Sequence, residues 1–133
     1  MRTVITFGTF DVFHVGHLRL LDRARALGDR LVVGVSSDEL NVRKKSRTPI
    51  YSESDRQEIL LGLSCVDEVF LEESLELKRR YIQECNAQVL VMGDDWAGAF
   101  DHLSDVCEVI YLPRTPSVST TQIIEIVTTG RDI

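Results

Sequence analysis

Short apolar runs rich in β-branched residues alternate with helical patterns along this chain, and no other feature constrains the fold as strongly. Strands are predicted at 3–7, 30–36, 67–71, 88–92 and 107–112. Helices are predicted at 16–27, 53–63, 74–85 and 120–128. Two of the strand runs are almost continuously apolar, which is typical of strands covered on both faces. We therefore expect an α/β fold: a doubly wound, five-stranded parallel sheet with helices on both faces.

Composition narrows the class of protein. With 133 residues, 44% of them hydrophobic, the chain is expected to form one domain over residues 1–133. A net charge of −6 argues against binding a nucleic acid polymer. No apolar stretch approaches membrane-spanning length, and three cysteines without a CxxC pair indicate thiols in a reducing compartment, not a metal site. We expect a cytoplasmic protein with no membrane partner.

Residues 8–17, Gly-Thr-Phe-Asp-Val-Phe-His-Val-Gly-His, join the first predicted strand to the first predicted helix. A glycine-containing turn before a helix N-terminus exposes free backbone N–H groups, and the helix dipole adds attraction for an anion. His14 and His17 add hydrogen-bond donors, and positive charge when protonated. Gly16 lets the backbone approach a phosphate closely. This segment predicts chemistry on a nucleoside triphosphate.

Two further segments follow predicted strands. Residues 114–121 place Arg114 ahead of hydroxyl residues and a helix start, which predicts a second anion cradle. Residues 93–96 supply Asp95, a carboxylate able to accept hydrogen bonds from a base or a sugar, and Trp96, expected to form a wall of the pocket. Because ligands of such sheets bind at the carboxyl ends of the strands, we expect the three segments to converge. The basic segment 41–51 is expected to be an irregular flap over the site.

Taken together, GTFDVFHVGH, VDEV at 66–69, VMGDDW, CEVIYLPRT and STT resemble the HxGH nucleotidyltransferases, most closely the small cytidylyltransferases. The resemblance extends from Val4 to about Glu125. It implies a Rossmann-like sheet of strand order 3-2-1-4-5, a homodimer, and Mg²⁺-dependent transfer of CMP from CTP to a phosphorylated alcohol. The first expectation for the acceptor is sn-glycerol 3-phosphate, which would give CDP-glycerol for cell wall or capsule biosynthesis.

Carried over position by position, the resemblance implies roles for single residues. Catalytic roles are expected for His14, His17, Lys45 and Arg114. Contacts to the nucleotide are expected from Gly8, Thr9, Phe10, Asp11, Gly16, Arg47, Asp95, Thr115, Ser119 and Thr120. Contacts to the acceptor are expected from Lys44, Lys45, Arg56, Lys78 and Trp96. No residue is predicted to be a dedicated metal ligand, although Asp11 and Asp94 could bias a magnesium ion.

Several alternatives stay open at this point. Lys44 and Lys45 compete for the acceptor, because the segment is one residue longer than is usual in the family. Ser64-Cys65 stands where the family commonly has Arg-Tyr, so the acceptor could be another phospho-alcohol or a hydroxyalkyl phosphonate. Adenylyl transfer, as in FAD synthesis, is the enzymatic rival, and a nucleotide-sensing module without catalysis is the non-enzymatic one.

Overall fold

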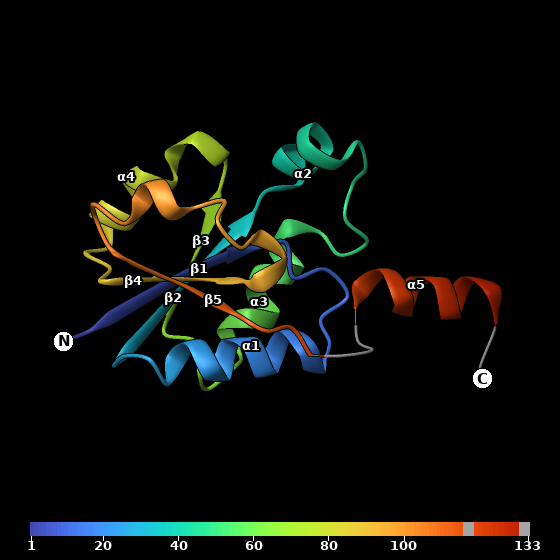
Figure 1. The fold of residues 1–133 in the computed structure, drawn as a ribbon. Helices are drawn as coiled ribbons and strands as arrows, with labels where there is room; N and C mark the ends of the chain where they lie inside the picture. Colours follow the sequence, from blue (N-terminus) through green and yellow to red (C-terminus); the bar gives the residue numbers. More distant parts are fainter. Residues whose placement is uncertain (116–118, 131–133) are drawn as a thin grey trace.

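A computed structural model describes residues 1–115 and 119–130 of the chain. Its sheet consists of β1 (Thr3–Gly8), β2 (Arg30–Ser36), β3 (Glu68–Glu72), β4 (Val89–Gly93) and β5 (Glu108–Leu112). All neighbouring strands are parallel, and their order across the sheet is β3-β2-β1-β4-β5. The expected fold and strand order are confirmed (Figure 1).

Each face of the sheet is covered by helices, because successive residues of the central strands point to opposite sides. On one face Val4 packs with Leu21 of α1 (Val15–Arg25) and Leu60 of α3 (Glu53–Leu61). On the other face Ile5 packs with Ile82 of α4 (Lys78–Glu84). Figure 1 shows α1 and α4 on opposite sides of the strands. The two layers leave the carboxyl ends of β1 and β4 open.

Residues Asp38–Lys45 form a helix, α2, so the expectation of an irregular segment over 41–51 is wrong in its first half. The helix lacks a strong apolar period, which is why its pattern was not found. Instead, the Ser37 side chain caps its N-terminus by accepting from the backbone N–H of Leu40. Acidic residues in its first turn and basic residues in its last turn complement the helix dipole. Only the stretch after Lys45 is irregular.

Smaller differences occur after β3 and β4. The predicted helix 74–85 begins as a 3₁₀ turn, η1 (Leu75–Leu77), before α4. Two more 3₁₀ turns, η2 (Asp94–Trp96) and η3 (Asp101–Leu103), lie between β4 and β5. The three cysteines are free thiols, and only Cys65 is fully buried. None of the helices in the described ranges is long and apolar enough to cross a membrane.

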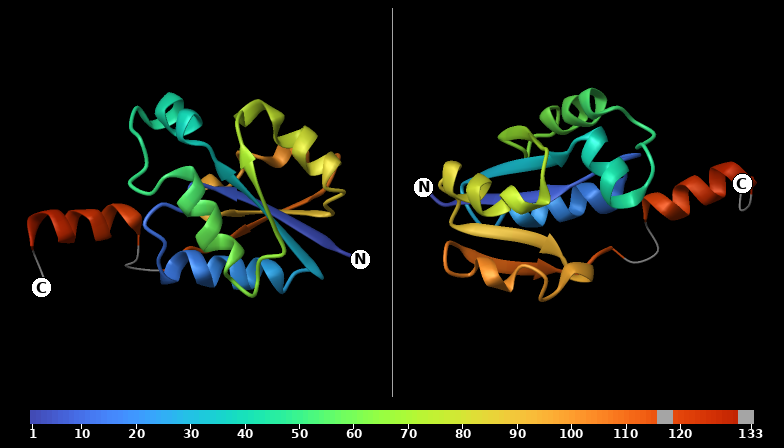
Figure 2. Two further views of the ribbon diagram at one scale, coloured as in Figure 1. Left: turned by 180° about the vertical axis from the view of Figure 1, so that it is seen from behind. Right: turned by 90° about the horizontal axis from the view of Figure 1, so that it is seen from above.

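The C-terminal helix α5 (Thr120–Thr129) extends away from the sheet and buries none of its residues fully (Figure 2). Its N-terminus is nevertheless fixed. The Ser119 side chain accepts from the backbone N–H of Gln122, and the Thr120 hydroxyl donates to the backbone carbonyl of Asp11 at 2.8 Å. This long-range bond places the start of α5 beside the loop that follows β1.

Candidate active site

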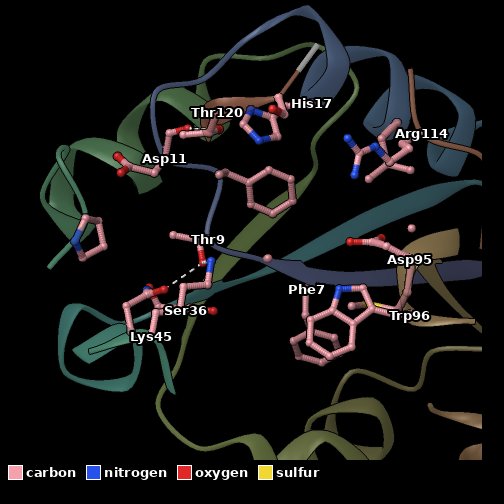
Figure 3. A pocket seen from close by; sticks show the side chains of 18 of the residues that line it. Phe7, Thr9, Asp11, His17, Ser36, Lys45, Asp95, Trp96, Arg114 and Thr120 are labelled. Atoms are coloured by element: carbon pink, nitrogen blue, oxygen red, sulfur yellow. Dashed lines mark hydrogen bonds between the residues drawn. The ribbon is translucent and has the colours of Figure 1, made fainter. Parts of the chain in front are cut away.

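A cavity of about 540 Å³ opens at the carboxyl ends of β1 and β4 (Figure 3). This volume lies in the range typical of small-molecule sites. The three segments predicted to converge all line it: the loop after β1, the turn after β4, and the start of α5. Every predicted site residue except Arg56 lies on its wall: Gly8, Thr9, Phe10, Asp11, His14, Gly16, His17, Lys44, Lys45, Arg47, Lys78, Asp95, Trp96, Arg114, Thr115, Ser119 and Thr120.

The two histidines build the N-terminus of α1. His14 is the N-cap residue, and its Nδ1 accepts from the backbone N–H of Gly16 at 3.0 Å. His17 completes a capping box, because its Nδ1 accepts from the backbone N–H of His14 at 3.2 Å. A nitrogen that accepts a hydrogen bond carries no proton, so each neutral ring carries its proton on Nε2. The two Nε2–H groups are therefore available as donors.

Burial keeps this pair uncharged at neutral pH. The pKa of His17 is lowered to about 4, chiefly by burial and then by the neighbouring His14. Burial also lowers the pKa of His14. The rings stack with centroids 3.8 Å apart, an arrangement in which two imidazolium ions would repel each other. In the free protein the pair therefore presents neutral Nε2–H groups to the cavity and not the positive charge that the sequence analysis also considered.

Positive charge in the cavity comes instead from lysine and arginine. Within the described part of the chain, five cations line the wall, namely Lys44, Lys45, Arg47, Lys78 and Arg114. Three carboxylates, those of Asp11, Glu72 and Asp95, lie among them. The wall thus has a surplus of two positive charges in a protein whose net charge is −6. Such a cavity attracts small anions while the rest of the surface repels polyanions.

The competing lysines of α2 point to different partners. Lys44 donates to the Ser36 hydroxyl at the end of β2 at 2.9 Å. Lys45 reaches the Thr9 hydroxyl in the loop after β1, with Nζ and Oγ1 3.5 Å apart (Figure 3). Burial lowers the pKa of both lysines, and that of Lys44 falls to about 8. Both lysines line the cavity, and because their partners differ, each ammonium group lies at a different point of the wall.

Asp11 lies on the cavity wall, but its carboxylate is engaged by the protein's own backbone. Its carboxylate accepts from the backbone N–H groups of Val12, Ile50 and Tyr51, at 3.0, 2.7 and 2.8 Å. These bonds tie the irregular stretch after α2 to the loop after β1. A carboxylate held by three amides has little capacity left for a nucleotide or a metal ion. We therefore assign Asp11 to holding the cavity wall together.

Arg56 lies outside the cavity wall, and its side chain is fully buried. Its guanidinium donates to the backbone carbonyls of Thr9, Ser36 and Tyr51 and pairs with Asp38 at 2.6 Å. These partners join the ends of β1 and β2 to the loop before α3. The predicted contact between Arg56 and the acceptor has no counterpart in this geometry.

The loop after β1 has a strained backbone that sequence reasoning did not predict. Phe10 and Val12 both have positive φ angles, 54° and 46°, although neither is glycine. Such residues cost about 1–3 kcal/mol each and often occur at functional sites. Phe10 is buried, and its ring edge contacts His17 with centroids 5.4 Å apart. The strained backbone at Phe10 thus places its ring against the imidazole of His17.

The turn after β4 supplies the remaining wall. Asp95 and Trp96 in η2 both line the cavity, whereas Asp94 does not. The indole of Trp96 is 49% exposed and lies against the ring of Phe100, with centroids 5.7 Å apart. A Cβ atom at Gly93 would lie 2.7 Å from the Asp95 carboxylate, so a larger residue there would displace that side chain. The aromatic pair leaves an open apolar surface beside a carboxylate.

Three polar lining residues were missed by sequence reasoning: Ser36, Asn41 and Glu72. Ser36 and Glu72 end adjacent strands and are register partners. The position at the end of a predicted strand was the available signal for both. Ser64 and Cys65, the departure from the family pattern, do not line the cavity, and Cys65 lies in the core with Leu21 and Leu60.

The part of the chain that the structure describes contains no cluster of side chains typical of a dedicated metal site. Within residues 1–115 and 119–130, no group of three or more histidine, cysteine or acidic side chains is close enough to hold an ion. Asp11, one of the two carboxylates considered for magnesium, is held by backbone amides. Asp94, the other, is off the cavity wall.

Comparison with known proteins adds independent findings. Residues 5–126 match the family model described as cytidylyltransferase-like. A glycerol-3-phosphate cytidylyltransferase of Bacillus subtilis (strain 168) is 51% identical over 125 residues, covering 94% of this chain and 96% of that protein. A protein of the same name from Staphylococcus aureus (strain NCTC 8325 / PS 47) is 45% identical and covers 92% of each chain.

More distant matches share the fold. An FAD synthase of Thermococcus onnurineus (strain NA1) is 32% identical over 132 residues, covering 92% of this chain and 88% of that protein. The crystal structure of the lipopolysaccharide core biosynthesis protein from Thermoplasma volcanium GSS1 matches with a TM-score of 0.76 at 24% identity. That match covers 86% of this chain and 98% of that one.

Proposed function

This chain belongs to the cytidylyltransferase-like family, and on that basis we propose that it transfers CMP from CTP to sn-glycerol 3-phosphate, giving CDP-glycerol and pyrophosphate. The observation that carries the proposal is the pair of Nε2–H donors on α1 in the same cavity as the start of α5. Two helix N-termini and two neutral imidazoles form a binding surface for a triphosphate.

In the proposed reaction an oxygen of the acceptor phosphate attacks the α-phosphorus of CTP. A new P–O bond forms as the bond to the β-phosphate oxygen breaks, and pyrophosphate leaves. The acceptor is already ionised, so no general base is needed. The protein contributes placement and stabilisation of the charge that develops on the α-phosphate oxygens. His14 and His17 donate to these oxygens, while Ser119, Thr120 and Arg114 bind the rest of the triphosphate.

The acceptor end of the cavity is assigned to Lys44 and Lys78. Both ammonium groups lie near the carboxyl ends of β2 and β3, whereas the histidines lie at the start of α1. Lys45 lies beside Thr9, in the loop after β1. Because the substrates are both anions, cations between them reduce their mutual repulsion. Trp96 and Asp95 border the cavity on the side where a base and ribose could bind.

Mg²⁺ enters this proposal as part of the substrate MgCTP, since the described residues form no resident metal site. No step above depends on an ion held by the protein. A homodimer and a cytoplasmic location remain proposals that rest on the family resemblance and on the free cysteines. Light scattering of the purified protein tests the first.

The decisive experiment measures pyrophosphate release and product mass for CTP and for ATP. Each nucleotide is offered with glycerol 3-phosphate, phosphocholine, phosphoethanolamine, a hydroxyalkyl phosphonate and FMN. We expect CDP-glycerol as the main product. The 32% identity to an FAD synthase makes FAD formation from ATP and FMN the specific rival. FAD as the main product would overturn the proposal, and CTP binding without any release would indicate a sensing module.

A further inference from the structure

The acceptor end of the cavity contains a buried carboxylate to which no role has been assigned. Glu72, the last residue of β3, is 1% exposed. Its Oε2 lies 2.5 Å from Nζ of Lys78, which is itself 6% exposed. The Lys78 ammonium also lies 4.8 Å from the ring centroid of Phe7 and 5.5 Å from that of Phe100. The pair is thus held in an aromatic, largely dry environment, where charges interact strongly.

The other oxygen of Glu72 connects to Lys44. Ser36 donates its hydroxyl proton to Oε1 of Glu72 at 3.4 Å, and the same hydroxyl oxygen accepts from Lys44 at 2.9 Å. The direction is fixed, because an ammonium group can only donate and a carboxylate can only accept. This contact depends on the sheet, in which Ser36 and Glu72 are register partners on adjacent parallel strands. One carboxylate therefore connects two lysines from different helices.

We propose that Glu72 is a positioning residue of the acceptor subsite, holding Lys78 directly and Lys44 through Ser36 so that both ammonium groups face the acceptor phosphate. This inference rests on the proposed function, because it gives the acceptor's binding site its charge. Glu72 does not itself bind the anion, since a carboxylate would repel a phosphate. It offsets the repulsion between two cations that must lie close together.

The charges around Lys44 support this role. The pKa of Lys44 is lowered to about 8, chiefly by burial, and the nearby positive charges of Lys45, Lys78 and Arg56 lower it as well. Glu72 is the group that raises it. Without that carboxylate, the pKa of Lys44 should fall below about 8. A substantial share of Lys44 would then lose its charge at neutral pH.

The test is the substitution Glu72→Gln, which keeps the shape of the side chain and removes its charge. Glu73→Gln is the matched control, because it removes the same charge from an exposed neighbour that does not line the cavity. The first measurement is the pH titration of the lysine amines in the ligand-free protein. The amines are ¹³C-methylated, and NMR records their titration. We expect the Lys44 titration to move down by about one pH unit in Glu72→Gln, a ten-fold change in proton affinity. No shift is expected in Glu73→Gln.

The second measurement is the pH profile of turnover. With Glu72→Gln we expect the KM for glycerol 3-phosphate to rise about ten-fold at pH 8, while the KM for CTP changes little. The alkaline decline of kcat/KM for the acceptor should begin at a lower pH. A merely structural role would lower the melting temperature and leave the profile in place. If neither the titration nor the profile moves, the proposal is wrong.

A second variant covers the case in which Glu72→Gln does not fold. Ser36→Ala breaks the link to Lys44 and leaves the pair of Glu72 and Lys78 intact. It should also lower the Lys44 titration and raise the acceptor KM, and unchanged values in this variant would overturn the proposal. The titration needs no substrate, so it is read even if the wild-type protein fails to make CDP-glycerol. In that event the proposed function fails, but the titration still shows whether Glu72 raises the proton affinity of Lys44.

Discussion

The substitution His17→Asn separates two roles of one imidazole. Nδ1 of His17 accepts from the backbone N–H of His14 at 3.2 Å and so helps to cap α1. Its Nε2–H is the proposed donor to the α-phosphate. An asparagine side chain can place its amide oxygen near the position of Nδ1, but it is too short to place a donor at the position of Nε2. The substitution therefore keeps the cap and removes the donor.

Magnitudes follow from these roles. Loss of one donor to a developing oxyanion costs about 10²–10³-fold in turnover, or about 2.7–4 kcal/mol. Loss of a helix cap costs about 1 kcal/mol of stability, which for a domain of this size is roughly 4 °C in melting temperature. We expect His17→Asn to lose turnover by this factor with nearly wild-type stability. His17→Ala should lose turnover equally and lose the stability of the cap as well.

The assays are pyrophosphate release with CTP and glycerol 3-phosphate, and thermal unfolding followed by circular dichroism. His102→Asn is the matched control, because His102 is exposed in η3 and does not line the cavity. It should change neither quantity. Turnover of His17→Asn within ten-fold of wild type would refute the donor role. A melting temperature as low as that of His17→Ala would refute the capping role.

Three further predictions concern stability and the cavity wall. Because the pKa of His17 is about 4 in the folded protein and about 6.5 in the unfolded chain, the unfolded state binds more protons between these values. The free energy of unfolding should therefore decrease by up to about 3 kcal/mol as pH falls from 6.5 towards 4. Urea unfolding at several pH values should show a smaller decrease in His17→Asn. The same dependence of unfolding free energy on pH in both proteins would contradict this prediction. Asp11→Asn should release the backbone of Ile50 and Tyr51, and faster tryptic cleavage after Lys45 would be the sign, whereas wild-type cleavage rates would exclude this role. Arg56→Met should destabilise the fold by about 3–5 kcal/mol, since it leaves buried partners unpaired; wild-type stability with a raised acceptor KM would instead restore the predicted acceptor contact.

The sequence by itself determined the sheet and the convergence of three segments on one cavity at the ends of its strands. Apolar runs such as 30–36 and 88–92 are read locally, and their alternation with helices leaves few possible topologies. His14 and His17 were found because a strand, a turn and a helix start are contiguous in the chain. Helix α2 was not found, because its stability comes from capping and from charges at its ends, and its apolar period is weak.

Only the tertiary structure decided how the side chains pair. Whether Arg56 faces a substrate or holds the ends of two strands depends on which carbonyls approach it, and those lie up to 47 residues away. The protonated nitrogen of each histidine follows from hydrogen-bond geometry that no residue spacing specifies. The contact of Glu72 with Ser36 exists because parallel strands align residues 36 positions apart. Such pairings depend on which strands become neighbours and on which loops pack beside their ends, and neither is specified by a local pattern in the sequence.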